Sequence, residues 1–317
     1  MSVSVHAQTK DDAKVSFAYD VDFQMQFDNR EFYRSGFTPS MTIFGARLTP
    51  SVGLAVQQSN GTLHKLMAGI DVMKDFGNSP VSSDRAAADS PETDNKLSNL
   101  KLFREITLYY SVEKQMGKTG LSLLAGVFPR RFSEGNYSRA FFSDSLRFYD
   151  NNLEGLLIKI RRPKAYYEVG CDWMGMYDTF RRERFMIFSS GEAQVAPVLS
   201  LGYSAYLYHY SCSRIADGVV DNVLLNPYLK LGFEHLVDIQ KLSLRVGWLQ
   251  AMQNDRAMVG KYVFPGGAEL DFEVQKWNVG IRNELFFGKD MMPYYSSVDP
   301  AGYTYSNLLY MGSPFYR

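Results

Sequence analysis

Residues 15–28 alternate strictly between apolar and polar side chains. The even positions are polar, apart from Ala18. Successive side chains of a β-strand point to opposite faces, so this segment predicts a strand with one apolar and one charged face. A soluble sheet would turn the apolar face inward, whereas an outer-membrane barrel would turn it toward lipid. The apolar side chains occupy every odd position: Val15, Phe17, Tyr19, Val21, Phe23, Met25 and Phe27.

The same alternation recurs along most of the chain, with no competing helical period. It predicts about thirteen strands, the last of them near residues 277–287. No apolar run is long enough for a membrane helix, so a chain that crosses a membrane must do so as a closed barrel. The predicted fold is therefore all-β: an antiparallel transmembrane β-barrel, with about 14–16 strands in the complete chain.

The connections between the predicted strands alternate between short and long. Short turns at one end and longer loops at the other are typical of outer-membrane barrels. A soluble, secreted β-sandwich is the rival architecture, but its strands usually have only about five or six residues. The long connections are residues 29–40, 77–100, 131–152, 211–224 and 253–268.

The two ends of the chain carry further expectations. Residues 1–7 resemble the end of a secretory signal, because Val5 and Ala7 suit positions −3 and −1 of a cleavage site. Residues 8–317 then form a single β-barrel domain. The tail after residue 288 has no strand pattern, and bacterial barrels usually have an even number of strands. We therefore expect one to three further strands beyond the C-terminus.

Charged residues at the inward positions predict a hydrated interior, because they are too numerous for a dry core. Acidic residues outnumber basic ones among them, which favours cations weakly. The pore-lining candidates are Arg47, Asp71, Glu105, Glu113, Lys159, Arg161, Glu168, Asp172, Lys230, Glu234, Arg245, Asp271, Glu273, Arg282 and Glu284.

The long connection at 131–152 mixes arginines, acids and aromatic residues. It either folds into the lumen and narrows it, or caps the barrel mouth from outside. The constriction candidates are Arg130, Arg131, Arg139, Asp144 and Arg147.

Signals for catalysis are poor. The sequence has no Gly-x-Ser-x-Gly or His-Glu-x-x-His motif and no spaced set of metal ligands, so we expect no enzyme, cofactor or metal. A barrel hydrolase would need serine and histidine side by side on the outer face. His209 with Ser211 or Ser213 is the only approximation, and an interfacial histidine beside loop serines is its more ordinary interpretation.

Three segments resemble porin-like outer-membrane barrels of the Bacteroidota, and more distantly the phosphate-selective porins. They are "DSLRFYDNNLEGLLIKI" (144–160), "FGKDMMPYY" (287–295) and "YMGSPFYR" (310–317). The resemblance implies an outer-membrane location and a barrel that continues for further strands. It does not identify a substrate.

Together these patterns predict a porin-like channel of the bacterial outer membrane for passive diffusion of small polar or charged solutes. Its expected partners are outer-membrane lipid, small solutes or ions, and further copies of itself. The chain has 34 basic and 34 acidic residues, which gives no electrostatic basis for nucleic-acid binding. The alternatives are a loop-plugged receptor or structural barrel, then a soluble sandwich or a barrel hydrolase.

Overall fold

The computed structural model describes residues 13–33, 40–76, 103–233, 239–302 and 304–317. Within these ranges, one sheet contains thirteen strands in chain order, and each strand is antiparallel to its neighbours. This confirms the predicted all-β antiparallel fold. The strands are β1 (Lys14–Arg30), β2 (Met41–Gln57), β3 (Leu63–Asp75), β4 (Phe103–Met116), β5 (Thr119–Pro129), β6 (Asn152–Arg162), β7 (Ala165–Gly175), β8 (Arg184–Gln194), β9 (Leu199–Tyr210), β10 (Val220–Gly232), β11 (Lys241–Asp255), β12 (Gly266–Lys276) and β13 (Val279–Gly288).

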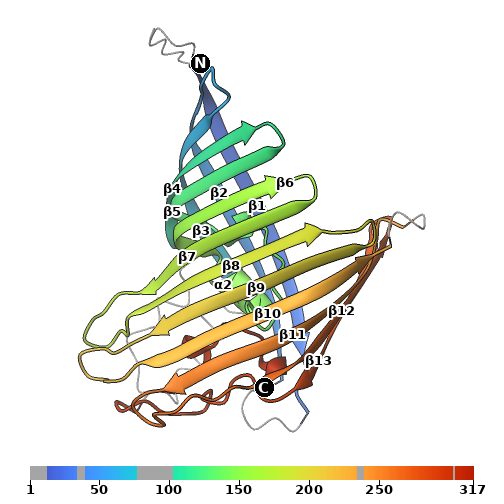
Figure 1. Ribbon diagram of the computed structural model, residues 1–317. Coiled ribbons are helices and arrows are strands. Elements are labelled where there is room, and N and C mark those ends of the chain that lie inside the picture. Colours follow the sequence, from blue (N-terminus) through green and yellow to red (C-terminus); the bar gives the residue numbers. More distant parts are fainter. Residues whose placement is uncertain (1–12, 34–39, 77–102, 234–238, 303) are drawn as a thin grey trace. The chain divides into compact units, whose positions relative to one another are not determined.

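The chain forms two compact units (Figure 1). The first comprises residues 1–115 and 124–128, and it contains β1–β3 and nearly all of β4. The second comprises residues 116–123 and 129–317, and it contains β6–β13. Helical segments in the second unit are short: η4 (Arg130–Phe132), α2 (Asp144–Tyr149), α3 (Ser306–Leu309) and η5 (Pro314–Tyr316). Among the described residues, no helix is long and apolar enough to cross a membrane.

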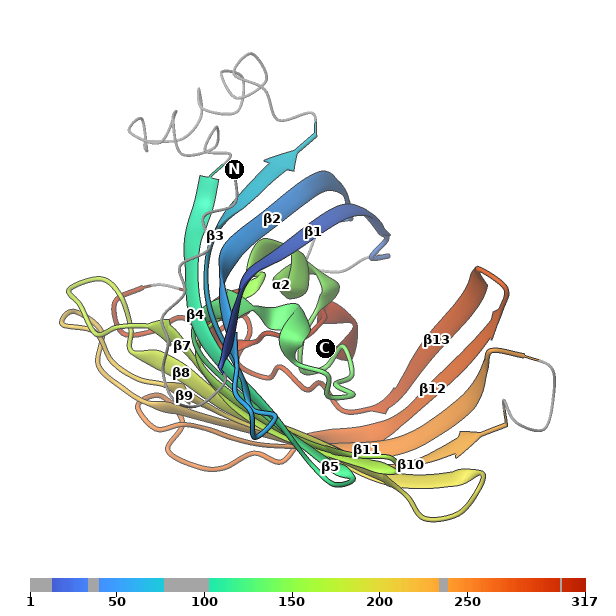
Figure 2. The same ribbon diagram turned by 90° about the horizontal axis from the view of Figure 1, so that it is seen from above.

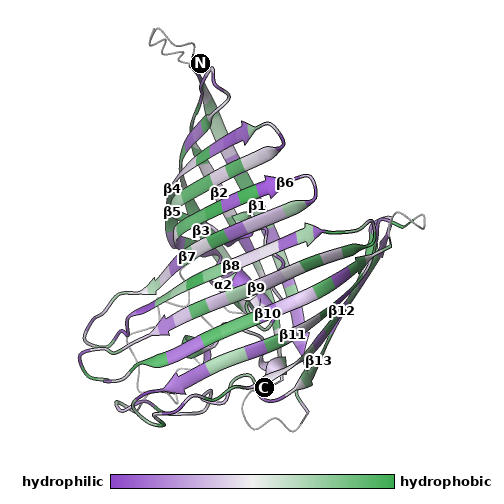
Figure 3. Cartoon of the chain, in the orientation of Figure 1, coloured by the Kyte–Doolittle hydropathy of each residue, from purple (hydrophilic) through white to green (hydrophobic). Residues whose placement is uncertain are grey.

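The apolar side chains of β1 face outward. Phe17 and Tyr19 are 67% and 75% exposed, and the other odd positions from Val15 to Phe27 are exposed as well. The polar positions from Asp20 to Asp28 are less exposed. The same holds in the second unit, where Leu207 on β9 and Leu229 on β10 are exposed. Figure 3 shows apolar and polar residues alternating along the strands. A sheet with its apolar side chains outward suits a lipid environment, and the protein is located in the outer membrane.

Loop lengths are sorted between the two ends of the strands. In the second unit, residues 163–164 join β6 to β7 and residues 277–278 join β12 to β13. The opposite ends carry the longer connections, such as 211–219 between β9 and β10 and 256–265 between β11 and β12. We call this opposite side the long-loop end. In outer-membrane barrels the longer loops are extracellular.

Two non-strand segments cover the inner face of the second unit. We call residues 130–151 the first inner segment and residues 289–317 the second inner segment. Figure 2 shows α2 and the C-terminal residues on the concave side of β7–β13. Backbone bonds join the two segments: the Ser143 N–H donates to the Met311 carbonyl at 2.9 Å, and the Ser313 N–H donates to the Arg139 carbonyl at 2.7 Å.

Aromatic side chains seal the first inner segment against the strands. Tyr137 packs edge-on against Phe188 of β8, with ring centres 5.9 Å apart. Phe141 packs in the same way against Tyr206 of β9 at 5.4 Å. Phe141 and Phe188 are completely buried or nearly so. These contacts pack the first inner segment closely against the inner face of β8 and β9.

Candidate functional site

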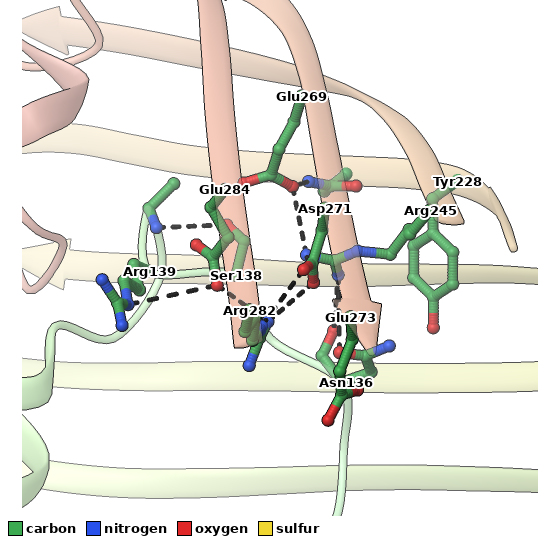
Figure 4. Close-up of polar contacts among 12 residues, drawn as sticks. Asn136, Ser138, Arg139, Tyr228, Arg245, Glu269, Asp271, Glu273, Arg282 and Glu284 are labelled. Carbon is green, nitrogen blue, oxygen red and sulfur yellow. Dashed lines mark hydrogen bonds and ion pairs between the residues drawn. The ribbon is translucent and has the colours of Figure 1, made fainter. Parts of the chain in front are cut away.

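Predicted pore-lining residues on β11–β13 form a partly buried ion network (Figure 4). Arg245 lies 3.4 Å from Glu269 and 3.3 Å from Asp271. Arg282 lies 2.7 Å from Asp271 and 2.8 Å from Glu284. The Arg245 and Glu269 side chains are 4% and 1% exposed, and buried ions are tolerated when they are paired.

Side chains of both inner segments complete this network. The Tyr316 hydroxyl donates to Glu269 at 2.7 Å, and burial followed by the Glu269 charge raises the pKa of Tyr316. Arg139 lies 4.0 Å from Glu284 (Figure 4). It also lies 3.2 Å from Asp144. The network therefore anchors the two segments to the sheet.

A second anchor lies on β7. The buried Glu168 accepts hydrogen bonds from the Ser133 hydroxyl at 2.6 Å, the Glu134 N–H at 2.8 Å and the Tyr137 hydroxyl at 2.9 Å. Burial and then the nearby Glu168 carboxylate raise the pKa of Tyr137, so this phenol stays a donor. On the same strand, Asp172 lies 3.0 Å from Arg130.

Most of the other candidates form ion pairs with nearby side chains. Some of these pairs are buried, such as Arg47–Asp71, and others are exposed, such as Arg161–Glu134. Glu105 faces Asp71 in the β3–β4 register, Arg131 lies over the Phe132 ring, and Arg147 is exposed on α2. Glu234 lies outside the described residues. The pairs are Arg47–Asp71, Lys65–Glu113, Lys159–Glu134, Arg161–Glu134, Lys230–Glu192 and Lys241–Glu273.

A different group of residues lies on the outward face, at the long-loop end of β7–β10. His209 of β9 is the direct register partner of Phe185 on β8 and of Asp221 on β10. The Phe185 ring stacks on the imidazole with centres 4.7 Å apart. Trp173 of β7 stacks on the other side of Phe185 at 5.1 Å. We call Trp173, Phe185, His209 and Asp221 the outer row.

Sequence alternation explains why His209 faces outward. Leu201 and Leu207 precede it at odd positions of β9 and are exposed on the apolar face. His209 follows on the same face, where the strand reaches its end. An imidazole in this position meets both the apolar surface and the polar loops, so it is placed at a boundary between lipid and water.

Ser211 follows His209 by two residues, directly beyond the end of β9, and is 8% exposed. The Ser211 N–H donates to the Glu183 carbonyl at 2.9 Å, and the Glu183 N–H donates to the Cys212 carbonyl at 3.2 Å. Ser211 and Cys212 thus lie opposite the single residue Glu183, which is the pattern of a β-bulge. Bulges often change the direction of a side chain beside an active site.

The two nearby serines differ in how their hydroxyls are used. The Ser213 oxygen accepts the Ala216 N–H at 3.1 Å and stabilises the turn of the loop. The Ser211 hydroxyl lies 3.8 Å from the Cys212 sulfur, a weak partner. Ser211 is therefore the better candidate for a reacting hydroxyl.

Asp221 is fixed by residues of the β11–β12 loop. Arg256 donates to both of its carboxylate oxygens, at 2.7 and 2.8 Å, and the Tyr262 hydroxyl donates at 2.9 Å. The hydrogen bond to Asp221 raises the pKa of Tyr262. The carboxylate is thus held beside its register partner His209. Sequence reasoning missed Asp221, which it placed in the loop 211–224. Val223 and Leu225 are apolar at odd positions of β10, and extending this alternation two residues toward the N-terminus would have included Asp221.

His209 and Asp221 are register partners, and Ser211 follows His209 by two residues. Serine, histidine and aspartate are the residue types of nucleophilic acyl transfer. Histidine can remove the serine proton, and the carboxylate can orient the imidazole and stabilise its charged form. No group of three or more metal-binding side chains occurs in the described part of the chain.

The chain was compared with known proteins. Residues 8–224 match the model of a family described as Lipid A 3'-O-deacylase-type, and this match includes the outer row and Ser211. No curated protein matches the chain significantly. The match contradicts the expected resemblance to porins, because deacylases are enzymes that act on outer-membrane lipid. The predictions of a porin, of a receptor or structural barrel, and of a protein without enzymatic activity are therefore wrong. The match covers more than half of the chain, which therefore belongs to the Lipid A 3'-O-deacylase-type family of outer-membrane enzymes.

Proposed function

We propose that this protein hydrolyses an ester-linked acyl chain of lipid A, at the position that the family description gives, with Ser211, His209 and Asp221 as its reactive set. One observation carries the proposal. The outer row lies on the lipid-facing surface at the long-loop end, which is the level of the outer leaflet, and Ser211 begins the loop that follows His209. Lipid A resides in that leaflet, so its ester bonds can reach the site laterally.

Each member of the proposed set has its own role. His209 accepts the proton of the Ser211 hydroxyl while the serine oxygen bonds to the ester carbonyl carbon. The bond from that carbon to the sugar oxygen then breaks, and His209 passes the proton to the leaving oxygen. Water next attacks the acyl-serine ester with His209 as base, which releases the fatty acid and restores the serine.

Asp221 holds the imidazole for both half-reactions. Its carboxylate lies directly across the β9–β10 ladder from His209 and can stabilise the imidazolium that forms. Arg256 and Tyr262 keep the carboxylate ionised and fixed in place.

Product identification tests the proposed function. Purified protein in detergent micelles with lipid A should release one fatty acid per molecule, and the remaining lipid should lose the mass of a single acyl chain. The Ser211→Ala protein is the matched blank, and phospholipid in place of lipid A is the substrate control. Mass spectrometry measures both products. Unchanged lipid A, or equal release from phospholipid, would contradict the proposal.

Phe185 supplies a second test, because its ring fixes one face of the imidazole. A stacked aromatic contact contributes roughly 0.5–1.5 kcal/mol, so Phe185→Ala should lower kcat/KM for deacylation by about two- to tenfold. Phe272 of β12 is an exposed outward aromatic away from the outer row, which makes Phe272→Ala the control. Equal losses in the two variants would show that the Phe185 ring has no specific role.

A further inference from the structure

Arg182 connects the loop that carries Ser211 to the second inner segment. This buried guanidinium donates from Nη1 to the Ser211 carbonyl at 2.7 Å and to the Gly218 carbonyl at 3.4 Å. Its Nε and Nη2 both donate to one carboxylate oxygen of Asp299, at 3.1 and 2.9 Å. The same cation therefore binds both ends of the 211–219 loop and an acid that lies 117 positions away.

Aromatic rings enclose this ion pair. Arg182 lies over the Tyr210 ring at 5.1 Å and over the Tyr305 ring at 5.8 Å. Tyr305 in turn donates its hydroxyl to the buried Asp255 at 2.9 Å. Guanidinium groups suit such a place because they are planar, stack on aromatic faces and present donors in a fixed fork.

We infer that Asp299 and Arg182 are positioning residues that set the place of the Ser211 nucleophile from the inner side of the sheet. The inference rests on the proposed function, and it gives the second inner segment a part in catalysis. That segment lies outside residues 8–224, so the family match does not include this support. Neither residue touches the reacting atoms, since their contact with Ser211 is through its backbone carbonyl.

Loss of Asp299 should act on the serine through Arg182. Without its carboxylate partner, the buried Arg182 guanidinium is more stable when it turns toward water. Its hydrogen bond to the Ser211 carbonyl is then lost. A nucleophile displaced by about 1 Å can lose about a hundredfold in rate. Substrate contacts on the outward face are untouched, so the loss should fall on kcat and leave KM nearly constant.

The test measures how fast a fluorophosphonate modifies Ser211 in the full-length protein in detergent, with the site located by peptide mass spectrometry. Asp299→Ala should lower the second-order rate by about 10- to 100-fold. Asp299→Asn keeps an oxygen that accepts both Arg182 donors, so it should restore most of the rate. Hydrolysis of a short soluble ester should show the same pattern in kcat with KM unchanged.

Tyr316→Phe is the matched control in the same segment. It removes the 2.7 Å hydrogen bond to Glu269 but leaves the contacts of Arg182 intact, so the rate of modification should equal that of the unaltered protein. A rate that falls as far in Tyr316→Phe as in Asp299→Ala would overturn the inference, because general loosening of the segment would then explain both.

Failure of the inference can be told apart from failure of the proposed function. If the unaltered protein is not modified at Ser211, the proposed function fails. If it is modified and Asp299→Ala reacts at the same rate, only the positioning role is overturned. If Asp299→Ala does not fold, Arg182→Lys tests the inference instead. A lysine ammonium keeps the positive charge but cannot bind Asp299 and the Ser211 carbonyl at the same time. An unchanged rate in Arg182→Lys overturns the inference, and a fall of about tenfold or more supports it.

Discussion

Ser211→Ala is expected to lower the rate of lipid A deacylation by at least about a thousandfold. The substitution removes the oxygen that forms the acyl-enzyme ester, and removal of one member of such a set typically costs several orders of magnitude. The fold should be kept, because the Ser211 backbone bonds to Glu183 and Arg182 do not involve its hydroxyl. The measurement is release of fatty acid from lipid A in detergent micelles.

Ser213→Ala is the matched control for this serine. It deletes the same atom two residues along the same loop, where the hydroxyl only accepts the Ala216 N–H. We expect nearly full activity with a small loss of stability. If Ser213→Ala abolishes deacylation and Ser211→Ala does not, the nucleophile has been assigned to the wrong residue.

Arg245→Ala should destabilise the protein by about 3–5 kcal/mol. Arg245 is 3% exposed and faces Glu269, which is 1% exposed, as well as Asp271. Removal of the Arg245 guanidinium takes away an ion-pair partner from the carboxylates of Glu269 and Asp271. A buried charge that loses its partner lowers the stability of the fold. The free energy of unfolding in urea, measured in detergent micelles or lipid vesicles, reports the loss.

Arg282→Ala is the control because its side chain contacts the same Asp271 but is 42% exposed. Partial solvation weakens such a pair, so we expect a cost of about 1 kcal/mol or less. Equal costs for the two arginines would show that burial does not decide the strength of this network.

The strands and their faces could be predicted from sequence because alternation is a local property. On β1 the apolar side chains from Val15 to Phe27 determine both the strand and the face that meets lipid, and the structure exposes all of them. The two inner segments could not be predicted in this way. Residues 130–151 and 289–317 have no period, and their positions depend on distant partners such as the Glu269 contact of Tyr316.

The inward direction of the charged side chains also led to a wrong prediction of function. Alternation shows that Arg245, Asp271 and Glu168 point away from lipid, but it does not show what lies in front of them. Water would have made these residues a channel lining. Protein side chains, such as the three groups of the first inner segment around Glu168, make them anchors instead.

Part of the candidate site was visible in the sequence. His209 with Ser211 or Ser213 was the one serine–histidine approximation in the sequence, and it was interpreted as an interfacial histidine beside loop serines rather than as a catalytic pair. Asp221 was not found because its place beside His209 depends on the register between β9 and β10. The resemblance to porins rested on the pattern of long antiparallel strands, and architecture does not specify the chemistry of a site.

The position of the outer row on the membrane surface has a kinetic consequence. A reaction centre that opens onto the leaflet receives its substrate by two-dimensional diffusion, without transfer through the aqueous phase. Saturation should therefore follow the mole fraction of lipid A in the micelle or bilayer, and inert amphiphile should slow turnover by dilution even when the total concentration of substrate is constant.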